Sequence, residues 1–148
     1  MRALIDTCIV IDALQNRKGF CDDAQKIFLA VANKWFVGFL SAKSVADIYY
    51  LTHRYTHSDK DTRAVLNTLF QLFELIDTAG MDCRRALSSD VSDYEDAVMV
   101  ESVFRSGVDC IVTRNIKDYD KSPVPIYLPS DFLKLIESQE EELFWRKL

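Results

Sequence analysis

Five aspartates stand where this chain enters or turns from an expected helix or strand. The first, Asp6, directly follows a short apolar run with the pattern of a buried strand. In a parallel α/β sheet the ligand site forms at the carboxyl ends of the strands, so carboxylates far apart in the sequence can converge there. Converging carboxylates repel one another unless a hard cation neutralises them, and Mg²⁺ and Mn²⁺ prefer oxygen ligands. The pattern predicts metal-dependent nuclease chemistry, and its acids are Asp6, Asp12, Asp47, Asp93 and Asp96.

Asp96 departs furthest from the ordinary structural uses of an aspartate. Val100 and Val103 follow it at helical spacing, so its side chain should lie on the stripe that faces the interior. A buried carboxylate without a partner is costly, and a metal ion is one such partner. Asp93, three residues earlier, is expected to add a second carboxylate on the same face. Taken singly, Asp6, Asp12, Asp47 and Asp93 also suit helix caps or exposed helix positions.

The composition describes a soluble globular protein. The chain has 148 residues, of which 49% are apolar and 28% charged, as expected for about one domain. No signal-peptide pattern opens it and no apolar run approaches the roughly 20 residues that span a bilayer, so we expect a cytoplasmic protein with no membrane partner. The four cysteines lack zinc-site spacing and disulfide-scaffold density and are expected to be reduced.

The net charge of −5 argues against an open basic surface for nucleic acid, although acids gathered around a cation give the same excess. Two cationic clusters could hold phosphates or could simply be solvated charge: one around Arg54 and Lys60, the other Arg114, Lys117 and Lys121. A histidine pair in the first cluster, His53 and His57, has the spacing of a transition-metal clasp. It lacks the glutamate of a zincin, and a helix C-terminus favours histidines through its dipole alone.

Strands and helices are expected to alternate along the chain. The expected strands are 2–5, 35–40, 75–76, 110–113 and 125–128, and the expected helices are 9–14, 22–33, 44–55, 61–73, 81–88, 92–106 and one from about 130. Ser58, Ser92 and Ser130 are the expected N-caps. The alternation predicts an α/β fold, a three-layer α/β/α sandwich with a mostly parallel central sheet, in a single domain over residues 1–148.

Four segments occur in an order and spacing that resemble a known family. They are 4–12, 44–50, 92–97 and 111–115 with Asp118 and Tyr119 after it. This arrangement resembles the PIN domains, and among them the bacterial VapC-like ribonuclease toxins. The resemblance implies a Mg²⁺ or Mn²⁺ site held by Asp6, Asp47 and Asp96, with Asp93 as an additional ligand. Many members carry Glu at the position of Asp47 and an acid at that of Asn115. A fourth carboxylate would therefore come from Asp118, or a second ion would be weakly held.

The resemblance also implies a reaction and partners. The reaction is hydrolysis of RNA phosphodiester bonds, with Asp6, Asp47, Asp93 and Asp96 as the catalytic acids. Thr113, Arg114, Asn115 and Arg54 are the candidate contacts to RNA. VapC-like proteins generally pair with an antitoxin, so we expect the toxin of a type II toxin-antitoxin pair. The exposed end of the terminal helix, with Leu143, Phe144 and Trp145, could serve a homodimer or a partner helix.

Two other classes of function remain open. In a non-catalytic PIN-like binding module, the departures at Asp47 and Asn115 would mark a site that no longer holds metal. In a phosphoacceptor receiver domain, Asp77 would be the phosphorylated residue. A receiver needs adjacent acids after its first strand and a lysine after its last, whereas Asp6 is followed by Thr7 and Leu128 by proline.

Overall fold

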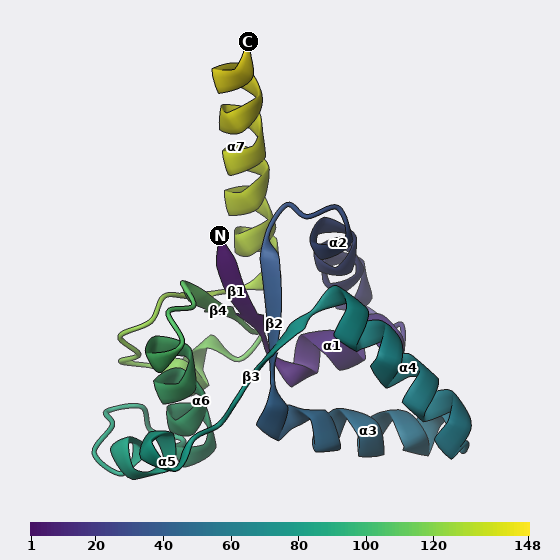
Figure 1. Ribbon diagram of the computed structural model, residues 1–148, viewed down its shortest axis with the longest axis vertical. Helices are drawn as coiled ribbons and strands as arrows, with labels where there is room; N and C mark the ends of the chain where they lie inside the picture. Colours follow the sequence, from purple (N-terminus) through teal and green to yellow (C-terminus); the bar gives the residue numbers. More distant parts are fainter.

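A five-stranded parallel sheet organises the molecule. Figure 1 shows the computed structural model, which describes residues 1–148. The central strand β1 pairs with β2 through Leu4 and Phe39 and with β4 through Leu4 and Ile111, and the strand order is β3-β2-β1-β4-β5. The strands are β1 Arg2–Ile5, β2 Val37–Ser41, β3 Glu74–Ile76, β4 Cys110–Val112 and β5 Ile126–Tyr127. All carboxyl ends therefore lie at one edge of the sheet.

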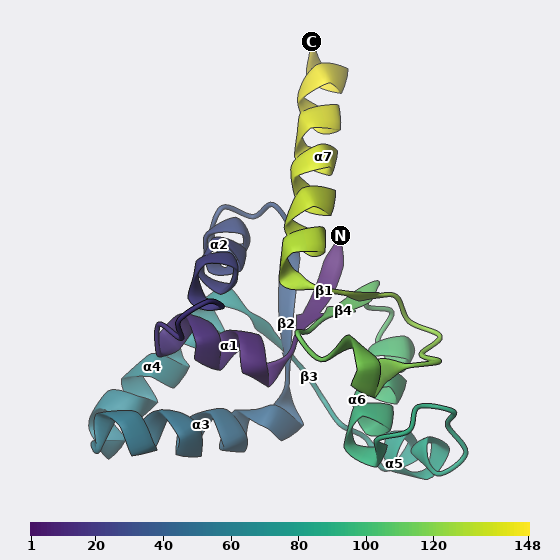
Figure 2. The same ribbon diagram turned by 180° about the vertical axis from the view of Figure 1, so that it is seen from behind.

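Helices cover both faces of the sheet, as the alternation of side chains along each strand requires. In β1, Ala3 and Ile5 pack into one core and Leu4 packs into the other. Figures 1 and 2 show α1 to α4 on one side of the molecule and α5 and α6 on the other. The helices are α1 Thr7–Leu14, α2 Cys21–Ala32, α3 Ala42–Thr56, α4 Asp59–Leu72, α5 Gly80–Ala86, α6 Tyr94–Arg105 and α7 Pro129–Lys147, with a 3-10 helix η1 Ile116–Tyr119. The predicted α/β sandwich is confirmed, and its sheet is wholly parallel.

The N-caps are less well predicted than the helices. Ser58 caps α4 as expected, since its side chain accepts a hydrogen bond from the backbone N–H of Asp61. The caps predicted at Ser92 and Ser130 are wrong. Asp93 is the N-cap of α6, and α7 begins at Pro129, whose missing N–H and fixed φ suit the first helical position.

Helix α7 extends well beyond the sheet (Figures 1 and 2). Its first turns are anchored in the core through Phe132, Leu133 and Ile136, whereas Phe144 and Trp145 near its end are exposed. No helix combines the length and apolar character required to cross a membrane. All four cysteines are unpaired.

Candidate active site

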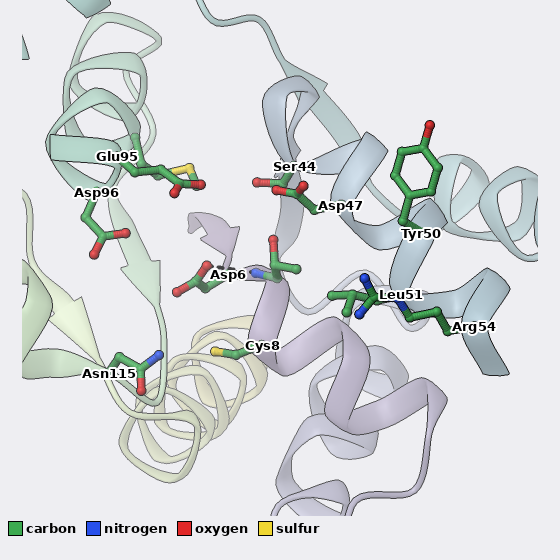
Figure 3. A pocket seen from close by; sticks show the side chains of 12 residues that line it. Asp6, Cys8, Ser44, Asp47, Tyr50, Leu51, Arg54, Glu95, Asp96 and Asn115 are labelled. Atoms are coloured by element: carbon green, nitrogen blue, oxygen red, sulfur yellow. Dashed lines mark hydrogen bonds between the residues drawn. The ribbon is translucent and has the colours of Figure 1, made fainter. Parts of the chain in front are cut away.

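A pocket of about 560 Å³ lies at the carboxyl edge of the sheet, between α3 and α6. Asp6 reaches it from the end of β1, Asp47 from α3 and Asp96 from the first turn of α6, and Figure 3 shows their carboxylates around the same space. Its twelve lining residues are Asp6, Thr7, Cys8, Ser44, Asp47, Tyr50, Leu51, Arg54, Glu95, Asp96, Met99 and Asn115. Carboxylates 90 residues apart are thus brought together by the parallel topology.

Asp6 is held in one orientation by its neighbours. Its Oδ1 accepts a hydrogen bond from the N–H of Thr7 at 2.8 Å, which caps α1. Its Oδ2 accepts one from Thr113 Oγ1 at 2.8 Å and lies 3.4 Å from the Tyr119 hydroxyl. Thr113 is buried just after β4, and the N–H of Asp6 donates to the carbonyl of Val112 at 3.0 Å. The pairing of β1 with β4 therefore places the Thr113 hydroxyl against this carboxylate.

Asp96 is the most perturbed carboxyl group of the pocket. Burial, followed by the negative charges of Asp93, Asp6 and Asp118, raises its pKa from 3.8 to about 7. The Tyr119 hydroxyl opposes this by favouring the ionised form. Burial, followed by the negative charges of Asp6 and Asp96, raises the pKa of Tyr119. The pocket therefore carries an excess of negative charge, which a bound cation would neutralise.

Two of the predicted metal ligands lie outside the pocket lining. Asp93 is exposed in extended backbone and its Oδ1 accepts the N–H of Asp96 at 3.0 Å. The expectation that it lies within the helix on the same face as Asp96 was wrong, because the helix begins one residue after it. Asp118 is exposed in η1. Both raise the pKa of Asp96 through their charge.

Asp12 does not line the pocket, because it forms a buried ion pair. Arg114 Nε donates to its Oδ2 at 2.6 Å and Arg114 Nη2 to its Oδ1 at 3.2 Å, and the guanidinium lies 4.1 Å from the ring centroid of Phe20. The pair ties α1 to the segment after β4. The segment after β4 also contains Thr113, which hydrogen-bonds Asp6, and Asn115, which lines the pocket. The ion pair therefore helps to hold both residues in position.

Several polar residues that line the pocket, among them Glu95 and Ser44, were not predicted as site residues. Glu95 lines it from α6, and its Oε1 lies 2.6 Å from Nζ of Lys43 in the first turn of α3. Ser44 is buried against it and precedes Asp47 by three residues. Helical i,i+3 spacing from a predicted ligand could have identified Ser44, and adjacency to Asp96 could have suggested Glu95.

The donor set suits a hard divalent cation. Asp6, Asp47, Glu95 and Asp96 offer carboxylate oxygens, the ligands that Mg²⁺ and Mn²⁺ prefer. Burial and then repulsion by neighbouring acids raise the pKa of Asp96, and a bound cation would favour its ionised form. As the side chains stand, no three His, Cys, Asp or Glu residues are placed to hold one ion. The chemistry of the residues therefore fits the cation, and the carboxylates must draw closer to coordinate it.

The histidine pair is used structurally. His53 stacks on Tyr49 with ring centroids 5.7 Å apart. His57 ends α3 in the left-handed conformation, with φ of 56°, and its N–H donates to the carbonyl of His53 at 2.8 Å. This is a helix C-cap rather than a clasp for a transition metal.

Solved structures share this fold. A toxin-antitoxin complex from Klebsiella pneumoniae matches with a TM-score of 0.65 at 22% identity, covering 86% of this chain and 97% of that one. VapBC2 from Rickettsia felis, bound to a DNA fragment from its promoter, matches with a TM-score of 0.62 at 15% identity. The match covers 86% of this chain and 98% of that one. VapC20 from Mycobacterium tuberculosis, described as a sarcin-ricin loop cleaving toxin, matches with a TM-score of 0.57 at 14% identity. The match covers 74% of this chain and 86% of that one.

Comparison at the level of sequence families agrees with these structures. No curated protein matches the chain. A family profile described as PIN domain matches residues 2–117, which include the pocket carboxylates, Thr113 and Asn115. The chain belongs to the PIN domain family.

Proposed function

We propose that the protein is a metal-dependent endoribonuclease that hydrolyses RNA phosphodiester bonds. The observation that supports this most is the convergence of Asp6, Asp47 and Asp96 on one pocket, where burial and the charges of neighbouring carboxylates raise the pKa of Asp96 to about 7. Perturbed carboxyl groups at the carboxyl edge of a parallel sheet are characteristic of a functional site. The PIN family assignment is consistent with a nuclease.

In the proposed mechanism Asp6 and Asp96 hold Mg²⁺ or Mn²⁺, and Asp47 completes the site from α3. The cation would supply an activated water at neutral pH and neutralise charge on the phosphate. Thr113 keeps Asp6 oriented through its hydrogen bond. Asp93 and Asp118, outside the pocket lining, contribute to the field that attracts the cation. No side chain needs to act as a nucleophile.

Arg54 and Asn115 line the pocket and are the proposed contacts to RNA. We assign Thr113 and Arg114 to positioning, because Thr113 hydrogen-bonds Asp6 and Arg114 holds Asp12. The description of VapC20 as a toxin that cleaves the sarcin-ricin loop supports RNA as the substrate class. The structures of toxin-antitoxin complexes support a toxin with a cognate antitoxin as its partner.

Cleavage of labelled single-stranded RNA tests the proposal. Wild type should cleave with Mn²⁺ or Mg²⁺ and stop when a chelator is added. Asp6→Asn and Asp96→Asn should each lower the rate by more than about 100-fold, the upper range for losing even an outer-sphere partner of a metal. Asp22→Asn, an equal charge change at an exposed position of α2, is the matched control and should cleave like wild type.

Two outcomes would contradict the proposal. Retained cleavage in either pocket variant would remove that residue from the mechanism. Folded wild type that binds RNA without cleaving it at any metal concentration would instead identify a non-catalytic PIN-like binding module.

A further inference from the structure

The wall of the pocket formed by the first turn of α3 has features that its carboxylates do not explain. Ser44 is only 5% exposed, faces the pocket and takes part in no hydrogen bond of the protein (Figure 3). The hydroxyl oxygen itself is open to the pocket, so a ligand there can accept a hydrogen bond from it.

The N-terminus of α3 is also left without a side-chain cap. Ser41 occupies the N-cap position, where serine is among the preferred residues, yet its hydroxyl caps no N–H group and has no hydrogen-bond partner. The N–H groups of the first turn of a helix have no partner within the helix and carry partial positive charge. Such a terminus binds anions, phosphate groups in particular.

A lysine stands beside these groups. Lys43, in the same turn, places its Nζ 2.6 Å from Oε1 of Glu95, on the opposite wall of the pocket. The carboxylate is 66% exposed, so the pair is accessible to solvent and contributes little to stability. A phosphate can replace Glu95 as the partner of Lys43 because both carry negative charge.

We propose that the first turn of α3, with the Ser44 hydroxyl and the Lys43 ammonium, binds a phosphate of the nucleic-acid strand beside the scissile bond. In the free protein Glu95 holds Lys43 at the pocket. When the strand binds, Lys43 exchanges Glu95 for the phosphate, and the hydroxyl of Ser44 donates to a phosphate oxygen. The identity of the strand as RNA rests on the proposed function, whereas the phosphate contact rests on α3 itself.

The competing explanation is that Lys43 and Glu95 only tie α3 to α6. The two explanations predict opposite effects of Glu95→Gln on binding of the strand. If the ion pair is a structural tie, Lys43→Met and Glu95→Gln should both loosen the pocket and weaken binding. If Glu95 competes with phosphate for Lys43, Lys43→Met should weaken binding of the strand and Glu95→Gln should strengthen it.

Equilibrium binding of short, fluorescently labelled single-stranded RNA, followed by anisotropy over a range of salt concentrations, tests the subsite. All variants carry Asp6→Asn, so the RNA is not consumed and Asn can still cap α1. Lys43→Met should reduce the slope of log K against log salt by about 0.7, the value for one phosphate contact on a single strand, and Lys43→Arg should restore it. Ser44→Ala should weaken binding about fivefold, as for one hydrogen bond. Lys134→Met, on exposed α7, should change neither quantity.

An unchanged slope in Lys43→Met, weaker binding in Glu95→Gln, or no effect of Ser44→Ala, each in a variant that unfolds in urea like its parent, would overturn the subsite. Absence of any RNA binding in the Asp6→Asn parent would overturn it as well. Cleavage by the wild type is measured separately, so loss of the subsite and failure of the ribonuclease assignment give different results.

Discussion

At the scale of single residues, Asp96 connects the stability of the protein to its proposed chemistry. Its pKa of about 7 means that the folded protein keeps this proton over a range in which the unfolded chain, with a value near 3.8, has lost it. The free energy of unfolding therefore falls as the pH rises through this window. The ionised form of Asp96 lowers the free energy of unfolding of the metal-free protein, and a bound cation would offset this loss.

Asp96→Asn should therefore stabilise the metal-free protein. At about pH 8.5 we expect a gain of about 1 to 2 kcal/mol, after allowance for solvent screening of a partly exposed group, and at about pH 4 we expect almost none. Urea denaturation at both pH values measures the difference. A variant less stable than wild type at the higher pH would show that the ionised carboxylate is compensated within the metal-free fold.

Arg114 is the residue whose role changes most between sequence and structure. Its partner Asp12 lies 102 residues earlier, and both nitrogens of its guanidinium fork reach that buried carboxylate. Removing one partner of a buried ion pair leaves an uncompensated charge. Arg17, 3.7 Å from Asp12, offsets only part of this loss because it is largely exposed.

Arg114→Met should destabilise the protein by about 3 kcal/mol, and the double variant Asp12→Asn with Arg114→Met should be less destabilised than the sum of the single changes. Urea denaturation of the four members of this cycle measures the coupling. If Arg114→Met left the midpoint unchanged while weakening RNA binding, the arginine would be a substrate contact instead.

At the scale of secondary-structure elements, apolar patterns together with cap residues predicted every strand and α-helix. The strands of β1 and β4 are continuous apolar runs because both faces of the sheet are covered, and α2 has a clear apolar stripe. The ends were harder to predict. Ser92 and Asp93 are both good caps in sequence, and the entry of the chain into α6 selects Asp93.

The same limit applies to the site. The parallel topology brings Asp6, Asp47 and Asp96 to one edge of the sheet, whereas Asp12 and Asp93, which the sequence grouped with them, lie outside the pocket lining. The rotation of α3 and α6 about their axes decides which other side chains face the pocket, and this depends on packing. Ser44 and Glu95 were missed for that reason, and the ion pair that occupies Asp12 cannot be read from positions so far apart.

A buried carboxylate, that of Asp82, links α5 to α6. Asp82 accepts hydrogen bonds from Arg105 Nε and Nη2, both at 2.9 Å, and from Ser102 at 3.0 Å. The hydrogen bonds from the Arg105 guanidinium are the main reason that the pKa of Asp82 lies below its ordinary value. A lowered pKa stabilises the fold above the ordinary value of about 3.9 and less so as the pH falls through it.

Arg105→Met should cost about 3 kcal/mol at neutral pH, because it leaves Asp82 charged and buried with neutral partners only. The cost should shrink at acidic pH, where Asp82 takes up a proton. Chemical denaturation at neutral and acidic pH provides the comparison. If Arg105→Met destabilises the protein equally at both pH values, the lost stability comes from packing of the arginine side chain and not from its charge.

At the scale of the whole molecule, the fold separates the proposed chemistry from the surfaces open to partners. The pocket lies at the carboxyl edge between α3 and α6, whereas α7 carries exposed Phe144 and Trp145 away from the sheet (Figures 1 and 2). The net charge of −5 includes the pocket acids, so a cation changes the sign of the potential where a phosphate would approach. On this account a bound cation strengthens the binding of RNA at the pocket.

The central claim is that carboxylates from three distant segments form one divalent-cation site, and calorimetric titration of Mn²⁺ into chelator-treated protein tests it without any assumption about substrate. Wild type and Asp22→Asn should bind Mn²⁺, whereas Asp6→Asn and Asp96→Asn should bind it at least about tenfold more weakly. Circular dichroism confirms folding of each sample. Equal affinity in all four proteins, or no binding to folded wild type, would contradict the claim.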